Sequence, residues 1–154
     1  MKGAAKSKTS PRRTAGPEEA AYLDLMRTTE MLSRPLAQLL KTEDLSPAQY
    51  NVLRILRGSP EGLTCGEIGS RMITRDPDIT RLLDRLEKRK LISRSRESRD
   101  RRVVLTRIAS DGLELLARLE QPVQETHRRL LGHLGLKRLR TLAQLLEICR
   151  SGPG

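Results

Sequence analysis

Hydrophobic residues recur at helical spacing along most of this chain of 154 residues. After Glu18, the apolar positions are Tyr22, Leu25, Met26, Leu32, Leu36, Leu39 and Leu40. Steps of three and four residues predict one face of a helix, in which Pro35 should cause a kink or a break. Helical spacing returns from Ser110 to the end of the chain, with Pro122 as the expected interruption.

Three short helices are predicted between these stretches. In LSPAQYNVLRILRG, Ser46 suits the N-cap, Pro47 the first helical position and Gln49 the return partner of a capping box. The buried face of this helix should carry Val52, Leu53 and Leu56.

The second and third short helices have their own start signals. Thr64 is followed three residues later by Glu67, which predicts another capping box. Asp76 and Pro77 are typical of a cap and a first helical position. The third short helix then has a regular apolar stripe, made of Ile79, Leu82, Leu83 and Leu86.

The period changes to that of β-strands after Lys90. LISRS and VVLTR are short β-prone runs, and the charged connection between them predicts a hairpin. The expected fold is therefore mostly α with a small β-hairpin. Four helices, a hairpin and two helices follow the order of a winged helix-turn-helix domain with additional helices at each end.

This order divides the chain into four segments. We expect a disordered basic tail over residues 1–16 and an N-terminal dimerisation helix over 17–45. The winged helix-turn-helix domain should span 46–108, and the C-terminal dimerisation helices 109–150.

Composition narrows the function to binding a polyanion. The formal net charge is +11, which attracts nucleic acid, an acidic membrane surface or an acidic protein. The chain has two Tyr and neither Phe nor Trp, so it lacks the aromatic platforms on which single-stranded bases stack.

Other classes of protein find little support. No stretch reaches the roughly 18 apolar residues of a membrane span, and the basic start lacks the apolar core of a signal peptide. We expect a cytoplasmic protein of the bacterial or archaeal nucleoid in which Cys65 and Cys149 are reduced thiols, most simply in packing roles. His127 and His133 lack a ligand cluster, and no nucleophile has a base beside it, so no metal, cofactor or enzymatic activity is expected.

The segment from Pro77 to Lys88 is the predicted recognition helix. Arg81 lies on its free face, where a guanidinium can bond both acceptors of a guanine. Thr80 would be a smaller contact and Arg75 a phosphate contact. The candidate DNA-binding residues of this segment are Arg75, Pro77, Thr80, Arg81 and Arg85.

Five arginines within nine positions form the hairpin's charged region, predicted to reach an adjacent minor groove. They are Arg94, Arg96, Arg99, Arg101 and Arg102. Asp100 lies among these cations and is expected to orient Arg102 by a charge-assisted hydrogen bond.

The sequence resembles the MarR (multiple-antibiotic-resistance regulator) family of transcription factors over about residues 20–150. The resemblance rests on LSPAQYNVLRIL, on DITRLLDRLEKRKLISR, on Asp100-x-Arg102 before an apolar strand, and on Gly112. It departs from the family at Ala109, where a Thr cap is usual and Ser110 is the expected replacement.

The resemblance implies a mostly helical homodimer whose first and last two helices interlock. Each winged domain would read one half of an inverted repeat, with Pro77, Thr80 and Arg81 in the major groove and Arg101 and Arg102 in the wing. Family members commonly repress transcription and are released by a small molecule or an oxidant.

Two features of the sequence bear on the dimer and on its effector. Leucines from Leu136 to Cys149 form an apolar stripe that a small domain leaves uncovered, which is typical of an interface. The family's ligand cleft, implied by the resemblance, would involve Tyr22, Met26 and Tyr50, for which simple core packing is the alternative.

The predicted function is sequence-specific binding of double-stranded DNA by a homodimeric transcriptional regulator that acts as a repressor. An architectural protein that tolerates many DNA sequences is the alternative. A winged helix that binds an acidic protein, and an RNA-binding module, fit the residues less well.

Overall fold

The computed structural model describes residues 16–97 and 100–152 of the chain. The chain divides into two compact units, residues 1–33 and residues 34–154. Helix α1 (Pro17–Lys41) begins in the first unit and ends in the second. The predicted tail lies outside the described residues, except for Gly16.

The first unit contributes residues 17–33 of α1, whose side chains are almost all exposed. Its large exposed apolar residues are Tyr22, Leu23, Leu25, Met26 and Met31. None of the described helices combines the length and hydrophobicity needed to cross a membrane. A helix with this much uncovered apolar surface is typical of an element that packs against another chain.

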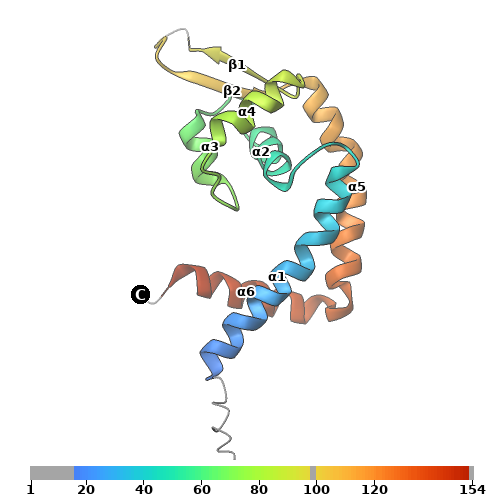
Figure 1. The fold of residues 1–154 in the computed structure, drawn as a ribbon. Helices are drawn as coiled ribbons and strands as arrows, with labels where there is room; N and C mark the ends of the chain where they lie inside the picture. The colour runs from blue at the N-terminus through green and yellow to red at the C-terminus, as the bar shows by residue number, and fades with distance from the viewer. Residues whose placement is uncertain (1–15, 98–99, 153–154) are drawn as a thin grey trace, which may run out of the picture. The chain divides into compact units, whose positions relative to one another are not determined.

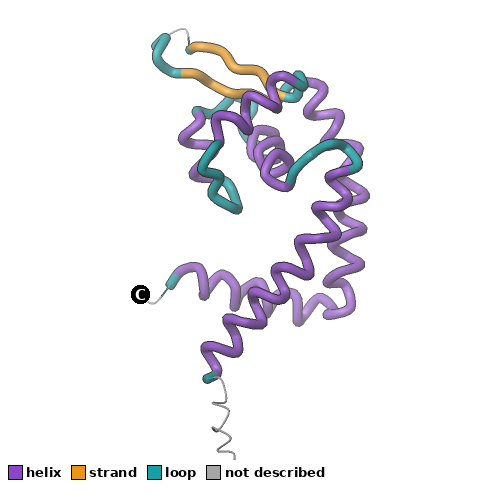
Figure 2. Tube along the Cα trace, viewed as in Figure 1, coloured by secondary structure: helices purple, strands orange, loops and turns teal. Residues whose placement is uncertain are grey.

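The second unit has the predicted order of helices and hairpin (Figures 1 and 2). After the end of α1 its elements are α2 (Pro47–Arg57), α3 (Cys65–Arg71), α4 (Ile79–Lys88), β1 (Ile92–Arg96), β2 (Val104–Ile108), α5 (Ser110–Leu131), the 3₁₀ turn η1 (Gly132–Leu134) and α6 (Gly135–Ser151). The expected fold, mostly α with one antiparallel hairpin, is confirmed.

The capping boxes of α2 and α3 form as predicted. The backbone N–H of Ser46 donates to Oε1 of Gln49 at 2.9 Å, and the N–H of Gln49 donates to Oγ of Ser46 at 3.1 Å. The N–H of Thr64 donates to Oε2 of Glu67 at 2.8 Å, and the N–H of Glu67 donates back at 3.3 Å. These bonds satisfy amide groups that a helix start leaves unpaired.

The start of α4 differs from the prediction. The helix begins at Ile79, so Pro77 lies in the preceding turn and is not the first helical residue. Asp76 does act locally, but its Oδ1 accepts from the N–H of Asp78 at 2.8 Å and so closes a turn. An Asp side chain can cap the start of a helix or close a turn by accepting from the N–H two residues later. Asp76 closes the turn.

Neither proline divides its helix. Pro35 lies within α1 and Pro122 lies within α5, and each helix is continuous through its proline. One proline removes a single donor, and packing of the rest of the helix can outweigh that loss. The predicted replacement cap is wrong, because Ala109 is the N-cap of α5 without a side-chain bond and Ser110 is already helical.

Helices α1 and α4 end in the same way. After α4, the N–H of Leu91 donates to the carbonyl of Leu86 at 3.0 Å, and Lys90 takes a left-handed backbone with φ of 60°. After α1, Leu45 donates to Leu40 at 3.0 Å, and Asp44 has φ of 53°. These are Schellman motifs, each closed by a pair of buried leucines.

Arg89 joins the two helix ends. Its Nη1 donates to the carbonyl of Asp44 at 2.6 Å, and its Nη2 donates to the carbonyl of Glu43 at 3.0 Å. The charged guanidinium satisfies carbonyl groups at the end of α1, where the helix leaves acceptors unpaired.

One aliphatic core lies in the second unit. The predicted inward residues of α2 and α4 are buried: Val52, Leu53, Leu56, Leu82, Leu83 and Leu86. Helix α5 buries Leu115, Leu116, Leu119 and Val123 and leaves Leu113 45% exposed. The apolar positions of α5 cover more than one face, and one of these faces packs on the core.

The hairpin is attached to the core at two places. Ile92 pairs with Ile108 at its base, and an isolated bridge joins Leu63 to Thr106. Gly112 in α5 lies directly against the backbone of Leu91, so that an added Cβ would overlap its carbonyl oxygen. The glycine permits the close approach of α5 to the segment that enters the hairpin.

Candidate nucleic-acid interface

The predicted recognition helix presents a polar face to solvent. Thr80, Arg81 and Arg85 of α4 are all exposed, whereas Leu83 and Leu86 on the opposite side are buried. A helix that buries one side and leaves a basic side free fits the width of the DNA major groove.

The turn before α4 is fixed by side chains of neighbouring elements. The N–H of Ile73 donates to Oδ1 of Asn51 at 2.8 Å, which attaches the turn to α2. Nη1 of Arg71 donates to Oγ of Ser59 at 2.9 Å. Arg75 and Pro77 are exposed in this turn. The turn therefore presents both residues beside the start of α4.

Asp78 is a neighbour of Arg81 that sequence reasoning missed. Its Oδ2 lies 3.4 Å from Nε of Arg81, and both side chains are exposed. The spacing of three residues on a helix was a signal for this pair. An exposed ion pair of this kind is weak and screened, so Arg81 remains available to another partner.

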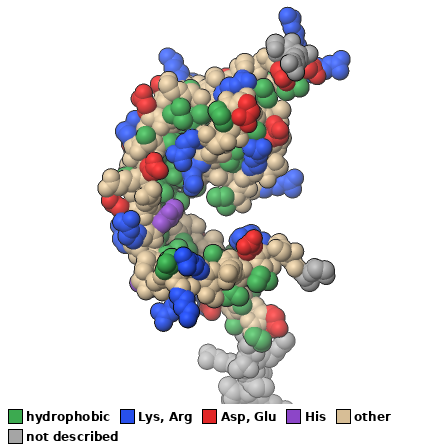
Figure 3. Space-filling model, turned by 180° about the vertical axis from the view of Figure 1, so that it is seen from behind, with side chains coloured by type: hydrophobic (Ala, Val, Ile, Leu, Met, Phe, Trp, Pro, Cys, Tyr) green, Lys and Arg blue, Asp and Glu red, His purple; other side chains and the backbone are tan. Residues whose placement is uncertain are grey.

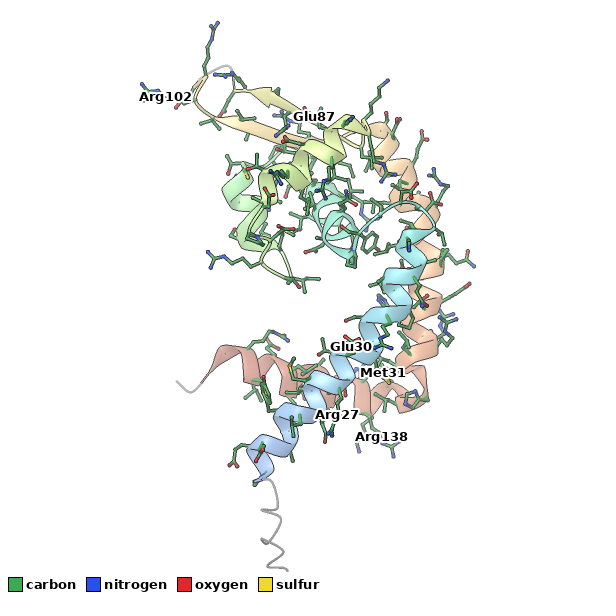
Figure 4. All side chains as sticks on the ribbon, viewed as in Figure 1. Arg27, Glu30, Met31, Glu87, Arg102 and Arg138 are labelled. Atoms are coloured by element: carbon green, nitrogen blue, oxygen red, sulfur yellow. The ribbon has the colours of Figure 1, made fainter. Side chains whose placement is uncertain are left out.

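The wing arginines occupy different environments. Arg101 and Arg102 are exposed at the end of the hairpin, where Figure 4 shows the side chain of Arg102 extending away from the domain. Arg96 folds across the hairpin, since its Nη1 donates to the carbonyl of Arg101 at 3.1 Å. The predicted contact Arg99 lies outside the described residues.

Asp100 acts on the backbone of the hairpin turn. Its Oδ1 accepts from the N–H of Arg102 at 2.9 Å, and its carbonyl accepts from the N–H of Val103 at 3.0 Å. The prediction had Asp100 holding the guanidinium of Arg102, whereas the recorded bond is to the backbone. Asp100 thus shapes the turn that carries Arg102 and leaves that side chain exposed.

Arg94 differs most from its predicted environment. Its Nη2 donates to Oδ1 of Asp84 and to Oε2 of Glu87, both at 2.6 Å, and its Nε donates to Glu87 at 2.9 Å. Only 25% of the Arg94 side chain is exposed. The hydrogen bonds to Glu87 and then to Asp84 raise the pKa of Arg94 above its usual value. Its donors are therefore directed toward the carboxylates of α4.

Positive side chains extend over the surface of the second unit. Figure 3 shows Lys and Arg side chains at the end of the hairpin and scattered over the face seen in that view. Acidic side chains lie among them, and Arg81 and Arg94 are paired with carboxylates of the recognition helix or its N-terminal cap. Arg85, Arg101 and Arg102 are exposed on the recognition helix and at the hairpin end. This charge pattern suits a polyanion that contacts both elements.

A small hollow lies between α2 and α5. It has a volume of about 150 Å³ and is lined by Tyr50, Arg54, Arg57, Leu116, Glu120, Val123, Gln124 and His127. The guanidinium of Arg54 lies 5.9 Å from the centre of the Tyr50 ring. Tyr22 and Met26, also predicted for an effector cleft, are exposed residues of the first unit.

The remaining candidates for chemistry stay isolated. Cys65 is half-buried at the start of α3 and Cys149 is exposed on α6, and both thiols are free. Over residues 16–97 and 100–152, no three His, Cys, Asp or Glu side chains come together in a way that would hold a metal ion.

Known proteins resemble this chain in sequence and in fold. The model of the MarR family matches residues 45–104. A crystal structure of a MarR transcription factor from Planctomyces limnophilus is 41% identical, with a TM-score of 0.68, covering 88% of this chain and 98% of that one.

Two further relatives are a regulator solved with its operator DNA and an operon repressor. A mutant MarR from Escherichia coli, solved with operator DNA, is 25% identical with a TM-score of 0.77, covering 87% of this chain and 94% of that one. The homoprotocatechuate degradative operon repressor of Escherichia coli is 24% identical over 84% of this chain and 86% of its own length. With its helix-turn-helix and hairpin in the same order, this chain belongs to the MarR family of DNA-binding transcription regulators, which are not enzymes.

Proposed function

We propose that this chain is a sequence-specific repressor that binds an inverted-repeat operator as a homodimer. The observation that carries the proposal is the exposed basic surface formed by α4, its preceding turn and the hairpin end. Arg81 and Thr80 would read base edges in the major groove, with Arg75, Pro77 and Arg85 beside them. Arg101 and Arg102 would lie in or over the adjacent minor groove.

The homodimer is supported by the apolar side chains that the single chain leaves uncovered. Helix α6 buries none of its residues, and Leu136, Leu145 and Ile148 are each more than half exposed. Two copies of the chain related by a twofold axis would cover such surfaces and would present two recognition helices about one DNA turn apart. A regulator of chromosomal genes acts in the cytoplasm, on the nucleoid.

An effector site is proposed at the hollow beside Tyr50. Its volume of about 150 Å³ admits only a small ligand, and Arg54, Arg57 and His127 supply polar groups around it. Binding there would release the operator if it favoured a conformation with a different spacing of the recognition helices. Loss of operator binding on adding a ligand, abolished by Tyr50→Leu, would support this assignment.

The main experiment is fluorescence anisotropy of the full chain with duplex DNA from the region upstream of its own gene. A shuffled duplex of equal composition serves as the reference, at near-physiological salt. A preference of about 1000-fold or more is typical of a specific regulator. Equal affinity for both duplexes, and for duplexes selected from random DNA, would instead support an architectural protein.

The variant Arg81→Ala tests the recognition helix, with Arg128→Ala on α5 as the matched control. We expect Arg81→Ala to lower the ratio of operator to shuffled-duplex affinity by about 5- to 150-fold, the range for one guanine contact of about 1–3 kcal/mol. The control should leave that ratio unchanged. An unchanged ratio in Arg81→Ala would contradict the placement of this helix in the major groove.

A further inference from the structure

Arg94 lies between the two elements that the proposed function brings to DNA. It belongs to β1, and its guanidinium bonds to two carboxylates of α4, Asp84 and Glu87. Figure 4 shows Glu87 on the side of α4 that faces the hairpin. These bonds are the ionic contacts recorded between the hairpin and the recognition helix within the described residues.

The geometry of this contact is more restrictive than that of a surface ion pair. Two nitrogens of Arg94 share Oε2 of Glu87 while Nη2 also reaches Asp84. The side chain of Arg94 is 25% exposed, compared with 75% for Arg81 in its pair with Asp78. A planar guanidinium held by two acceptors fixes both the distance and the angle between the strand and the helix.

The position of the carboxylates on α4 matters as well. Asp84 follows Thr80 by four residues, and Glu87 follows Asp84 by three, so all three lie along one side of the helix. Thr80, at the start of this side, is one of the residues predicted to enter the major groove. Arg94 therefore connects the hairpin to the helix next to the residues that would read DNA.

We propose that Arg94 is a positioning residue that holds the hairpin at a fixed angle to α4, so that the helix and the wing bind DNA as one rigid unit. The inference rests on the proposed function, because it assigns Arg94 to an internal role within that binding surface. The chain itself makes wing binding intramolecular once the helix is bound, and a rigid connection raises the effective concentration of the wing at its site and so the affinity of the whole. When Arg94 is lost, the hairpin samples more angles and the wing adds less to the affinity.

The test is a double-mutant cycle between Arg94 and Arg101, which is exposed at the hairpin end. Operator affinity is measured for wild type, Arg94→Gln, Arg101→Gln and the double variant, across a range of salt concentrations. We expect the cost of Arg101→Gln to shrink by about 2- to 100-fold in the Arg94→Gln background, the range found for coupled sites. Additive costs would overturn the proposal.

The salt dependence distinguishes positioning from direct contact with DNA. A lost phosphate contact makes the slope of log K against log salt about 0.9 less steep. If Arg94 acts only within the domain, Arg94→Gln should keep the wild-type slope while lowering the affinity. A slope reduced by a full contact would show that Arg94 touches the backbone of DNA and would contradict the positioning role.

Matched variants exclude a general loss of folding or charge. Arg107→Gln removes an arginine from the opposite face of the hairpin, where Nη1 donates to Oγ of Ser95 at 2.9 Å. It should be additive with Arg101→Gln. Arg94→Lys keeps the charge but cannot form the same fork, so it should reproduce the loss of coupling. Full rescue by Lys would mean that charge alone matters.

Failure of the proposed function would be seen in the wild-type reference. A wild-type chain without operator preference contradicts the proposed regulator itself. A wild-type chain that prefers its operator, together with an additive cycle, contradicts only the role of Arg94. Circular dichroism and the midpoint of thermal unfolding verify that each variant is folded before its affinity is compared.

Discussion

The winged domain and helix α6 differ in how much of their apolar surface one chain can cover. The winged domain buries Leu53, Leu56, Leu83 and Leu86 to within 1% of full burial, and the starts of α2 and α3 are capped. Helix α6 has five leucines among its 17 residues, but none of its residues is buried. The winged domain can therefore fold around its own core, whereas the apolar side chains of α6 need a complementary surface on another chain to cover them.

The largest effect should follow from damage to the core of the winged domain. Leu56→Ala removes a fully buried side chain and should lower the free energy of unfolding by about 2–5 kcal/mol. Urea unfolding followed by circular dichroism measures the change. The size of the loss should not depend on protein concentration, because the cavity lies within one chain. A strongly concentration-dependent loss would mean that the core and the interface are not separate.

A smaller loss is expected at the junction between the winged domain and α5. Gly112→Ala would force a methyl group against the carbonyl of Leu91 and within 2.9 Å of Cγ1 of Ile108, at a cost of about 1–3 kcal/mol. Gly66→Ala in α3 is the control, because no atom lies within 4 Å of its added Cβ. The control should gain up to about 1 kcal/mol of stability. Equal thermal midpoints for the two variants would disprove the close approach.

Changes on α6 should hardly affect the folding of the single chain. The double variant Leu145→Glu/Ile148→Glu alters two side chains that are more than half exposed, and surface changes usually stay within about 0.5 kcal/mol. The same variant should dissociate the proposed dimer, because charges would be buried in an apolar interface. Sedimentation velocity measures the mass, and Arg150→Glu on the same helix serves as a control. A dimer that survives the double variant would place the interface elsewhere.

The smallest effect concerns the two capping boxes, which differ in charge. Hydrogen bonds from the backbone and the side chain of Thr64 lower the pKa of Glu67 below its ordinary value. A carboxyl with a lowered folded pKa stabilises the protein above its unfolded pKa, and this stability is lost as pH falls through the folded value. Gln49 of the other box has no charge, so its contribution to the stability of the folded protein should not vary with pH.

The change that checks this is Glu67→Gln. The variant should show a flatter decline of thermal midpoint below about pH 4.3 than wild type, where Glu67 would otherwise be protonated. Gln49→Ala should lower the midpoint equally at all pH values. Parallel pH profiles for wild type and Glu67→Gln would mean that this carboxyl adds nothing to the acid sensitivity.

Much of the fold could be predicted because local signals and burial agreed. The capping boxes at Ser46 and Thr64 and the stripe on α4 each mark structure within a few residues. Neither Pro35 nor Pro122 divides its helix, because the loss of one hydrogen-bond donor can be outweighed by the packing of the rest of the helix. The spacing of apolar residues predicted helix α5 but could not state which of its apolar sides packs, since Leu113 is exposed and Leu115 is buried.

The candidate site was predictable by composition more than by geometry. Residue type and spacing indicated that Arg81 and Arg101 would be exposed cations, and both are exposed. They could not indicate that Arg94 would be bound by Asp84 and Glu87, because those partners lie seven and ten residues away and meet only when the strand folds back on α4. The bond from Asp100 to the backbone likewise depends on the hairpin turn.

The two Schellman motifs have a consequence for engineering the stability of this protein. Asp44 and Lys90 adopt left-handed backbones that cost a residue with a side chain about 1 kcal/mol more than they cost glycine. Replacing Asp44 with glycine would remove that strain in the folded chain and keep the carbonyl that Arg89 binds. Glycine also makes the unfolded chain more flexible, which offsets part of this gain. We therefore expect the free energy of unfolding to rise by only about a few tenths of a kcal/mol. Substitutions at these helix ends can thus raise the thermal stability slightly without changing any proposed DNA contact.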